Sequence, residues 1–201
     1  MAYSRSKTIH IFAGPNAIGK STLGEDFSET RNIIFVNPEE IRRQQLVLYG
    51  DNEDINFRQL HYIMDIQICN ALESDDEVII ESNLHDIEAY RFIDSYVRIY
   101  KAQSICYFHY TDNIEILRER ALNRERHLGH VVPEQMLVER YQNSFNLIIE
   151  NINRFDALYF FDNSTLDGPV RVLEIFDGEI NYINEDKQFD WSQAIIETLI
   201  Q

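Results

Sequence analysis

Short runs of apolar residues alternate along the chain with longer segments in which apolar positions recur every three to four residues. Five runs rich in β-branched and aromatic residues predict strands covered on both faces: 7–13, 32–37, 77–82, 104–110 and 156–162. The helical periodicity between them predicts helices over 20–30, 38–48, 54–74, 86–101, 112–127 and 133–154. This alternation favours an α/β fold of three layers, with right-handed crossovers and a mainly parallel sheet.

The pattern changes toward the end of the chain. Asp177-Gly178 separates two alternating runs in VRVLEIFDGEINYIN, which is typical of a β-hairpin turn. The segment DWSQAIIETLI then predicts a short closing helix. There is no internal repeat or linker-like tract, and 201 residues suit one domain. We therefore predict a single domain over 1–201, with a C-terminal β-hairpin and helix at about 165–201.

Charge and composition narrow the classes of partner. The chain has 18 Lys and Arg against 34 Asp and Glu, and its net charge of −16 disfavours nucleic acid as the main partner. No apolar run approaches the roughly 20 residues that span a bilayer. The first apolar run is short and continues into a glycine loop, unlike a secretory signal. We expect a cytoplasmic protein without a membrane partner, in which Cys69 and Cys106 are buried, reduced thiols.

The segment GPNAIGKST directly follows the first predicted strand and opens the first predicted helix. Residues Gly14, Pro15, Asn16, Ala17, Ile18, Gly19, Lys20 and Ser21 fit the pattern G-x-x-x-x-G-K-[ST], and Thr22 follows. Such glycines let successive backbone N–H groups turn inward around an anion at a helix N-terminus. Lys20 then places its charge on the terminal phosphates, and the Ser21 hydroxyl can bind Mg²⁺. The loop predicts binding of a nucleoside triphosphate.

Acidic residues follow the second and third predicted strands, at the edge of the sheet where ligands bind in such folds. Glu39 and Glu40 stand at the start of a predicted helix, where favourable interaction with the helix dipole explains them as well as catalysis does. Glu81 follows an apolar strand, so its carboxylate needs a cation, a sugar hydroxyl or a basic partner. Asp65 can approach Glu81 only if the helix that carries it packs suitably, and a solvated position is the alternative.

The segment after the fourth strand is rich in arginine in an otherwise acidic chain. Arg120 and Arg124 are four residues apart and share one face of the predicted helix. Because phosphoryl transfer needs cations around the migrating group, we assign these two residues to the phosphates. For Arg118 and Arg126 we favour solvated ion pairs with neighbouring glutamates.

The order of four motifs resembles the zeta toxin family of P-loop kinases, especially its chromosomal bacterial members, some of which are described as ABC-type ATPases. The motifs are GPNAIGKST, VNPEEI, VIIES and RERALNRERHLGHVVPEQMLVERY, all within about 7–155. Zeta toxins use ATP to phosphorylate the 3′-hydroxyl of UDP-N-acetylglucosamine, and many are held by an antitoxin. The resemblance implies a P-loop kinase fold, ATP and Mg²⁺ as cofactors, a nucleotide-sugar acceptor, and a protein antitoxin as a candidate partner.

Carried over by position, the resemblance implies that Lys20 and Ser21 bind the triphosphate and Mg²⁺, and that Glu39 takes the proton of the acceptor hydroxyl. Arg120 or Arg124 would clamp the phosphates. The acceptor site would consist of Glu81, Asn83, Asp65 and His130. The chain departs from the family pattern where Glu39 replaces an aspartate, where Leu128-Gly129-His130 replaces Gly-Gly-His, and where Ser82-Asn83 replaces threonines. These departures leave the identity of the acceptor open.

We therefore expect an ATP-dependent kinase of the zeta toxin type, with UDP-N-acetylglucosamine as the leading acceptor by resemblance. One alternative is a kinase that acts on another small hydroxyl compound. The alternative from another class is a nucleotide-binding ATPase or switch that acts through a protein partner. A kinase of nucleic-acid ends fits the net charge poorly.

Overall fold

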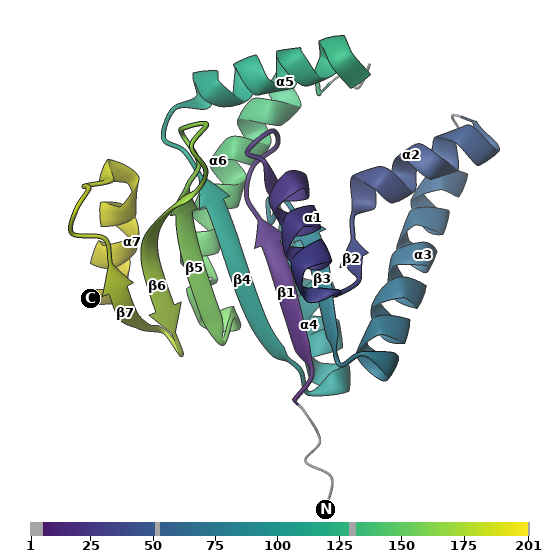
Figure 1. Ribbon diagram of the computed structural model, residues 1–201, viewed down its shortest axis with the longest axis horizontal. Coiled ribbons are helices and arrows are strands. Elements are labelled where there is room, and N and C mark those ends of the chain that lie inside the picture. Colours follow the sequence, from purple (N-terminus) through teal and green to yellow (C-terminus); the bar gives the residue numbers. More distant parts are fainter. Residues whose placement is uncertain (1–5, 51–52, 129–131, 201) are drawn as a thin grey trace, which may run out of the picture.

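The computed structural model describes residues 6–50, 53–128 and 132–200. Its strands form one seven-stranded sheet in the order β2-β3-β1-β4-β5-β6-β7 (Figure 1). The first five are parallel to one another, as predicted. Their bounds are Thr8–Ala13 (β1), Phe35–Val36 (β2), Glu77–Ser82 (β3), Gln103–Tyr110 (β4) and Ala157–Asp162 (β5).

The helices also follow the predicted order. Their bounds are Lys20–Arg31 (α1), Pro38–Tyr49 (α2), Glu53–Ser74 (α3), Ile87–Tyr100 (α4), Ile114–Leu128 (α5) and Glu134–Glu150 (α6). The helix predicted over 133–154 ends earlier, and its last part is a 3₁₀ turn, Ile152–Arg154. Within the described residues, no helix is both long enough and apolar enough to cross a membrane.

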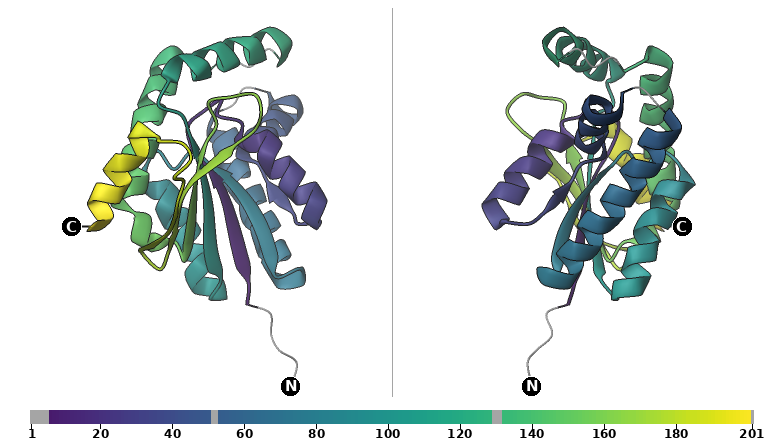
Figure 2. Two further views of the ribbon diagram at one scale, coloured as in Figure 1. Left: turned by 60° about the vertical axis from the view of Figure 1, so that its left-hand side comes forward. Right: turned by 90° about the vertical axis from the view of Figure 1, so that its right-hand side faces the viewer.

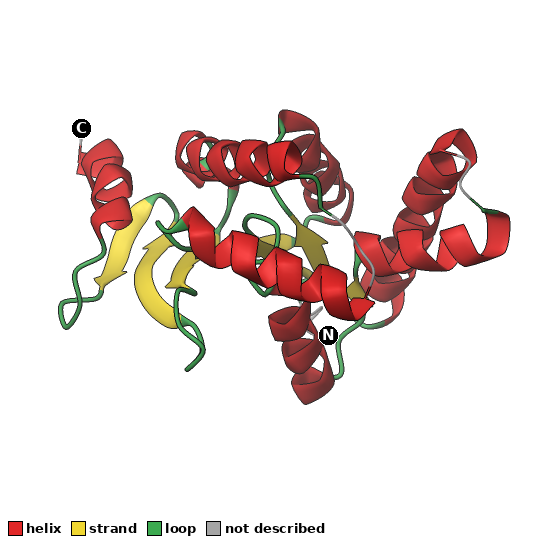
Figure 3. Ribbon diagram, turned by 90° about the horizontal axis from the view of Figure 1, so that it is seen from above, coloured by secondary structure: helices red, strands yellow, loops and turns green. Residues whose placement is uncertain are grey.

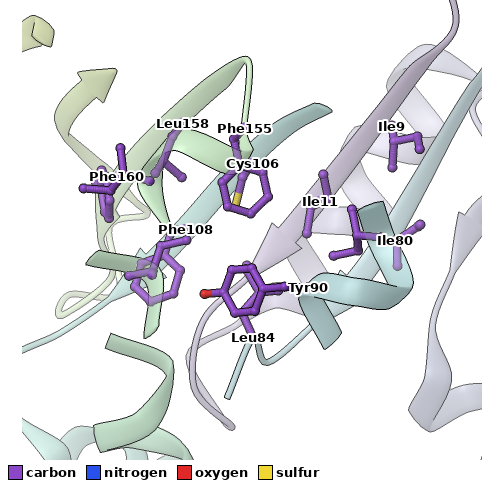
Figure 4. Packing of buried hydrophobic residues seen from close by; sticks show 14 of the residues in the cluster. Ile9, Ile11, Ile80, Leu84, Tyr90, Cys106, Phe108, Phe155, Leu158 and Phe160 are labelled. Atoms are coloured by element: carbon purple, nitrogen blue, oxygen red, sulfur yellow. The ribbon is translucent and has the colours of Figure 1, made fainter. Parts of the chain in front are cut away.

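The two faces of the sheet are covered by different helices (Figure 2). On one face α1 packs Leu23 and Phe27 against Phe12 and Ile79. On the other face α3, α4 and α6 cover the central strands. Figure 4 shows part of that larger core, in which buried side chains of β1, β3, β4 and β5 meet Tyr90 of α4. In β1 and β3 the continuous apolar runs of the sequence therefore mark strands buried on both sides.

The C-terminal segment continues the same sheet. Strand β6 (Val170–Phe176) pairs antiparallel with β5, and β7 (Glu179–Ile183) pairs antiparallel with β6 across the predicted turn at Asp177-Gly178. The closing helix, α7 (Asp190–Ile200), buries Trp191 and Ile195 in the larger core. The hairpin and helix are thus part of the packed structure.

The prediction of two buried cysteines is correct for only one of them. Cys106 is buried in β4, whereas Cys69 on α3 is partly exposed because it lies between the packed face and the solvent face of that helix. Both thiols are free.

The carboxyl ends of the parallel strands meet at one edge of the sheet. Ala13 at the end of β1 lies level with Ser82 of β3 and Phe108 of β4, and Tyr110 lies level with Asp162 of β5. Helix α5 crosses above this edge (Figures 1 and 3). The loops after β1, β3, β4 and β5 are therefore neighbours, and this edge is where a ligand is expected.

Candidate active site

The loop after β1 has a conformation that requires its glycines. Gly14 and Gly19 have φ values of 133° and 107°, in a region that favours glycine. A Cβ atom on Gly14 would also lie 2.1 Å from the backbone oxygen of His109 in β4. The loop therefore packs directly onto the neighbouring strand before it enters α1 at Lys20.

Side chains hold two carbonyl groups of this loop, those of Pro15 and Ile18. The Lys20 ammonium group donates a hydrogen bond to the Pro15 oxygen, at 2.8 Å, and the Asn163 amide donates to the Ile18 oxygen, at 2.7 Å. Arg120 makes a longer contact of 3.5 Å with the same Ile18 oxygen. Carbonyls held in this way leave the backbone N–H groups to form an anion site at the N-terminus of α1.

A cavity of about 300 Å³ opens over the loop. It is lined by residues of the loop and of α1, by two acidic residues and by two arginines of α5: Asn16, Ala17, Gly19, Lys20, Ser21, Thr22, Glu39, Glu81, Arg120 and Arg124. The structure thus brings most of the sequence-predicted residues into one cavity.

Lys20 is only 5% exposed. Burial lowers the pKa of its ammonium group to about 8, against the opposing effect of the nearby Glu81 and Glu39 carboxylates. The ammonium group is therefore largely desolvated, and a bound polyanion would favour its charged form.

Glu81 ends the buried part of β3 and is 9% exposed. Its carboxyl group lies near the Ser21 side chain, and its Oε2 atom has no hydrogen-bond partner among the described residues. Burial raises the pKa of this carboxyl, and Lys20 acts in the opposite direction. Paired serine and carboxylate oxygens are the donors that Mg²⁺ prefers, so this pair fits a magnesium ion beside the phosphates.

No cluster of three or more His, Cys, Asp or Glu residues is arranged to hold a metal ion in the described parts of the chain. A magnesium ion at Ser21 and Glu81 would therefore take its remaining ligands from phosphate oxygens and water, as this ion commonly does.

The two glutamates at the start of α2 have different surroundings. Asn37 caps the helix by accepting hydrogen bonds from the backbone of Glu39, at 2.9 Å, and of Glu40, at 3.2 Å. The Glu40 side chain pairs with Arg43 on the solvent side. The Glu39 side chain lines the cavity and forms an ion pair of 2.7 Å with Arg124. Of the two, only Glu39 faces the phosphate loop.

The arginines predicted from the sequence also differ in their surroundings: Arg120 and Arg124 line the cavity, whereas Arg118 does not. Arg120 bridges the Ile18 oxygen and the Thr165 oxygen, at 3.5 and 3.4 Å, and so lies between the phosphate loop and the β5–β6 loop. Arg124 faces Glu39. Arg118 pairs with Glu115 and Glu134 on the exposed side of α5, which agrees with its solvated interpretation.

Two of the four residues predicted for the acceptor site do not line the cavity. Asp65 is exposed on α3, where its carboxylate accepts a hydrogen bond from the Tyr96 hydroxyl of α4. Asn83 follows β3 but is absent from the residues that line the cavity. His130 lies outside the described residues.

Three residues that sequence reasoning had not assigned to the site lie against the phosphate loop. Arg140 of α6 donates a hydrogen bond of 3.3 Å to the Asn16 side chain, and burial lowers the pKa of its guanidinium group. His109 is buried beneath Gly14, and Asn163 holds Ile18. The only sequence signal was the place of Arg140 in the arginine-rich segment.

The strand order, the phosphate loop between β1 and α1 and the acidic residues at the strand ends define the P-loop NTPase fold in the form found in kinases. No protein-family model matches the chain, and no curated protein matches it. Comparison with solved structures nevertheless finds the same fold.

Three solved structures illustrate the likeness. One is from the PezAT chromosomal toxin–antitoxin system of Streptococcus pneumoniae, at 12% identity and a TM-score of 0.66, over 98% of this chain and 85% of that one. Another is from the AvrRxo1-ORF1:-ORF2 complex with ATP, at 11% identity and a TM-score of 0.61, over 96% of this chain and 64% of that one. The third is deoxyadenosine kinase from M. mycoides, at 17% identity and a TM-score of 0.50, over 79% of this chain and 91% of that one. At these identities the likeness is one of fold.

Proposed function

We propose that this protein is an ATP-dependent phosphotransferase that transfers the γ-phosphate of Mg·ATP to a hydroxyl group of a small molecule. The observation that carries the proposal is the meeting of a carboxylate, Glu39, with the phosphate loop and two arginines in one cavity. A loop that only bound nucleotide would not need a proton acceptor beside the terminal phosphate. Neighbours of the same fold include kinases, which supports the same class of reaction.

In this reaction the bond between the γ-phosphorus and the β–γ bridging oxygen breaks while the acceptor oxygen bonds to phosphorus. Glu39 takes the proton of the attacking hydroxyl. Lys20 and the backbone N–H groups hold the β- and γ-phosphates, and Arg124 moves from Glu39 to the charge that spreads over the migrating group. Ser21 and Glu81 would hold Mg²⁺, which neutralises phosphate charge when bound.

The acceptor that we propose is UDP-N-acetylglucosamine, on the basis of the zeta-toxin-like motif order and of the fold shared with a chain from the PezAT system. The proposal extends to a protein antitoxin as partner and to a cytoplasmic location. Asn83, Asp65 and His130 belong to it as acceptor-binding residues, and Asn83 and Asp65 would act only if acceptor binding draws them toward the cavity.

A second candidate is a nucleotide-binding ATPase or switch that acts through a protein partner. It is favoured by one observation: Asp65 and Asn83, two of the residues expected to bind a sugar, do not line the cavity. This candidate predicts slow ATP hydrolysis that no small hydroxyl compound stimulates.

Mass spectrometry of a metabolite extract incubated with the protein and ATP separates the candidates. We expect one or more phosphorylated nucleotide sugars with the wild type and with the control Arg118→Ala, whose side chain lies outside the cavity. Lys20→Ala and Glu39→Gln should give none. Absence of any phosphorylated product, from the extract and from purified UDP-N-acetylglucosamine, would contradict a kinase function.

A further inference from the structure

The first residue after β5, Asn163, connects the phosphate loop to the C-terminal part of the fold. Its side-chain amide donates to the Ile18 oxygen at 2.7 Å, and it is only 7% exposed. We propose that Asn163 is a positioning residue that fixes the phosphate-binding conformation of the loop, and that the C-terminal helix holds Asn163 in place. The proposal rests on the proposed function, because it concerns the same nucleotide site.

The geometry of one peptide group explains the effect. In a trans peptide, the C=O of one residue and the N–H of the next point in opposite directions. Asn163, which does not line the cavity, holds the Ile18 oxygen and so fixes the orientation of the peptide group between Ile18 and Gly19, whose N–H points the opposite way. With φ at 107°, Gly19 has the backbone freedom that would let this peptide rotate if the hydrogen bond were lost. A rotated peptide would present a carbonyl oxygen to the phosphates.

Asn163 is itself held by hydrogen bonds on both sides. Its backbone N–H donates to the Tyr110 oxygen at 2.8 Å, which fixes it to the end of β4. The preceding residue, Asp162, is 3% exposed and accepts hydrogen bonds from the Ser164 hydroxyl, at 3.0 Å, and from the Trp191 indole N–H, at 3.3 Å. Trp191 belongs to α7, so a chain of contacts runs from the C-terminal helix to the phosphate loop.

These contacts give a function to the C-terminal segment at about 165–201, which lies outside the zeta-toxin-like motifs. Helix α7 buries Trp191 against the aromatic rings of Tyr110 and Phe145. It therefore fixes the indole N–H that reaches Asp162. The C-terminal helix acts on nucleotide binding from a distance, without lining the cavity itself.

Isothermal titration calorimetry with Mg·ATP tests the proposal. Asn163→Asp keeps the shape of the side chain but removes the donor and places a carboxylate against the Ile18 oxygen. The control is Asn151→Asp. Asn151 follows α6 and does not line the cavity, and it is also buried and also donates to a backbone oxygen, that of Leu147 at 2.8 Å; its own side-chain oxygen accepts a hydrogen bond from Arg154. We expect the Kd for Mg·ATP to rise at least tenfold in Asn163→Asp and to stay within twofold of the wild type in Asn151→Asp.

Two further measurements keep a structural role separate from a positioning role. Asn163→Ala adds no charge and should raise the Kd for Mg·ATP about fivefold. Its melting temperature should equal that of Asn151→Asp. In kinase assays with either Asn163 variant, the KM for ATP should rise while the KM for the acceptor stays unchanged. Wild-type affinity in both folded Asn163 variants would overturn the positioning role and leave the proposed function intact. Absence of Mg·ATP binding by the wild type would overturn both.

Discussion

His109 provides a prediction about stability that depends on its burial beneath the phosphate loop. The ring is 2% exposed, stacks on Phe161 at 5.1 Å and on Phe12 at 6.0 Å, and neither of its nitrogens has a partner among the described residues. Burial, helped by the charge of Lys20, lowers the pKa of this imidazole from 6.5 to about 3. The folded protein therefore keeps His109 neutral at pH values where the unfolded chain protonates it.

The sign and the size of the effect follow from this difference. Because the unfolded chain binds the proton more tightly, the free energy of unfolding falls as the pH falls below 6.5, and the loss stops only near pH 3. At pH 5 the folded state is still unprotonated at this site, so the loss depends only on the unfolded-state pKa. It amounts to about 2 kcal/mol relative to pH 8.

The assay is urea unfolding at pH 8 and pH 5 of the wild type and of His109→Phe, which keeps an aromatic ring between Phe12 and Phe161. Burial also lowers the pKa of His10 and His85, so these residues contribute to the loss of stability in acid as well. The loss in the wild type is therefore compared with the loss in His109→Phe. We expect the loss between pH 8 and pH 5 to be about 2 kcal/mol smaller in His109→Phe. An equal loss in the wild type and His109→Phe would refute the reasoning.

Three further predictions concern the cavity. Gly14→Ala should abolish Mg·ATP binding in calorimetry and lower the stability by more than about 2 kcal/mol in urea unfolding, because its Cβ would meet a backbone oxygen at 2.1 Å. Gly168→Ala, whose Cβ meets nothing within 4 Å, should bind normally. The Kd for Mg·ATP should rise about tenfold from pH 7 to pH 9 as Lys20 loses its proton with a pKa of about 8, whereas Lys20→Arg should show no such rise. Arg124→Ala should lower kcat at least about 100-fold and Arg118→Ala less than twofold; similar values for the two variants would argue against a role for Arg124 at the phosphates.

Much of the fold could be predicted from local pattern. The apolar runs marked the five parallel strands because β1 and β3 are buried on both faces and β4 and β5 have one buried and one partly buried face. The turn at Asp177-Gly178 marked the hairpin, although its union with the main sheet depends on pairing between β5 and β6 that no local pattern shows. The phosphate loop was predictable because its backbone conformation restricts the residue types at Gly14 and Gly19.

The remainder of the site depends on contacts between distant parts of the chain. Asn163 and Ile18 are 145 positions apart, and Arg140 and Asn16 are 124 apart. Neither pair has a spacing that periodicity could reveal. The choice between Glu39 and Glu40 likewise needed the direction in which α2 leaves the sheet. Asp65 was predicted to lie in the site but does not line the cavity. Its carboxylate instead accepts a hydrogen bond from Tyr96, because of the way in which α3 packs against α4.

The most direct test of the account compares Mg·ATP with Mg·AMP in calorimetric titrations of the folded wild type. If Lys20 and the N–H groups of the loop hold the β- and γ-phosphates, ATP should bind at least about 100-fold more tightly than AMP, and Lys20→Ala should remove that preference. Equal affinity for the two nucleotides, or no heat with either, would contradict the central claim that this loop is a triphosphate site.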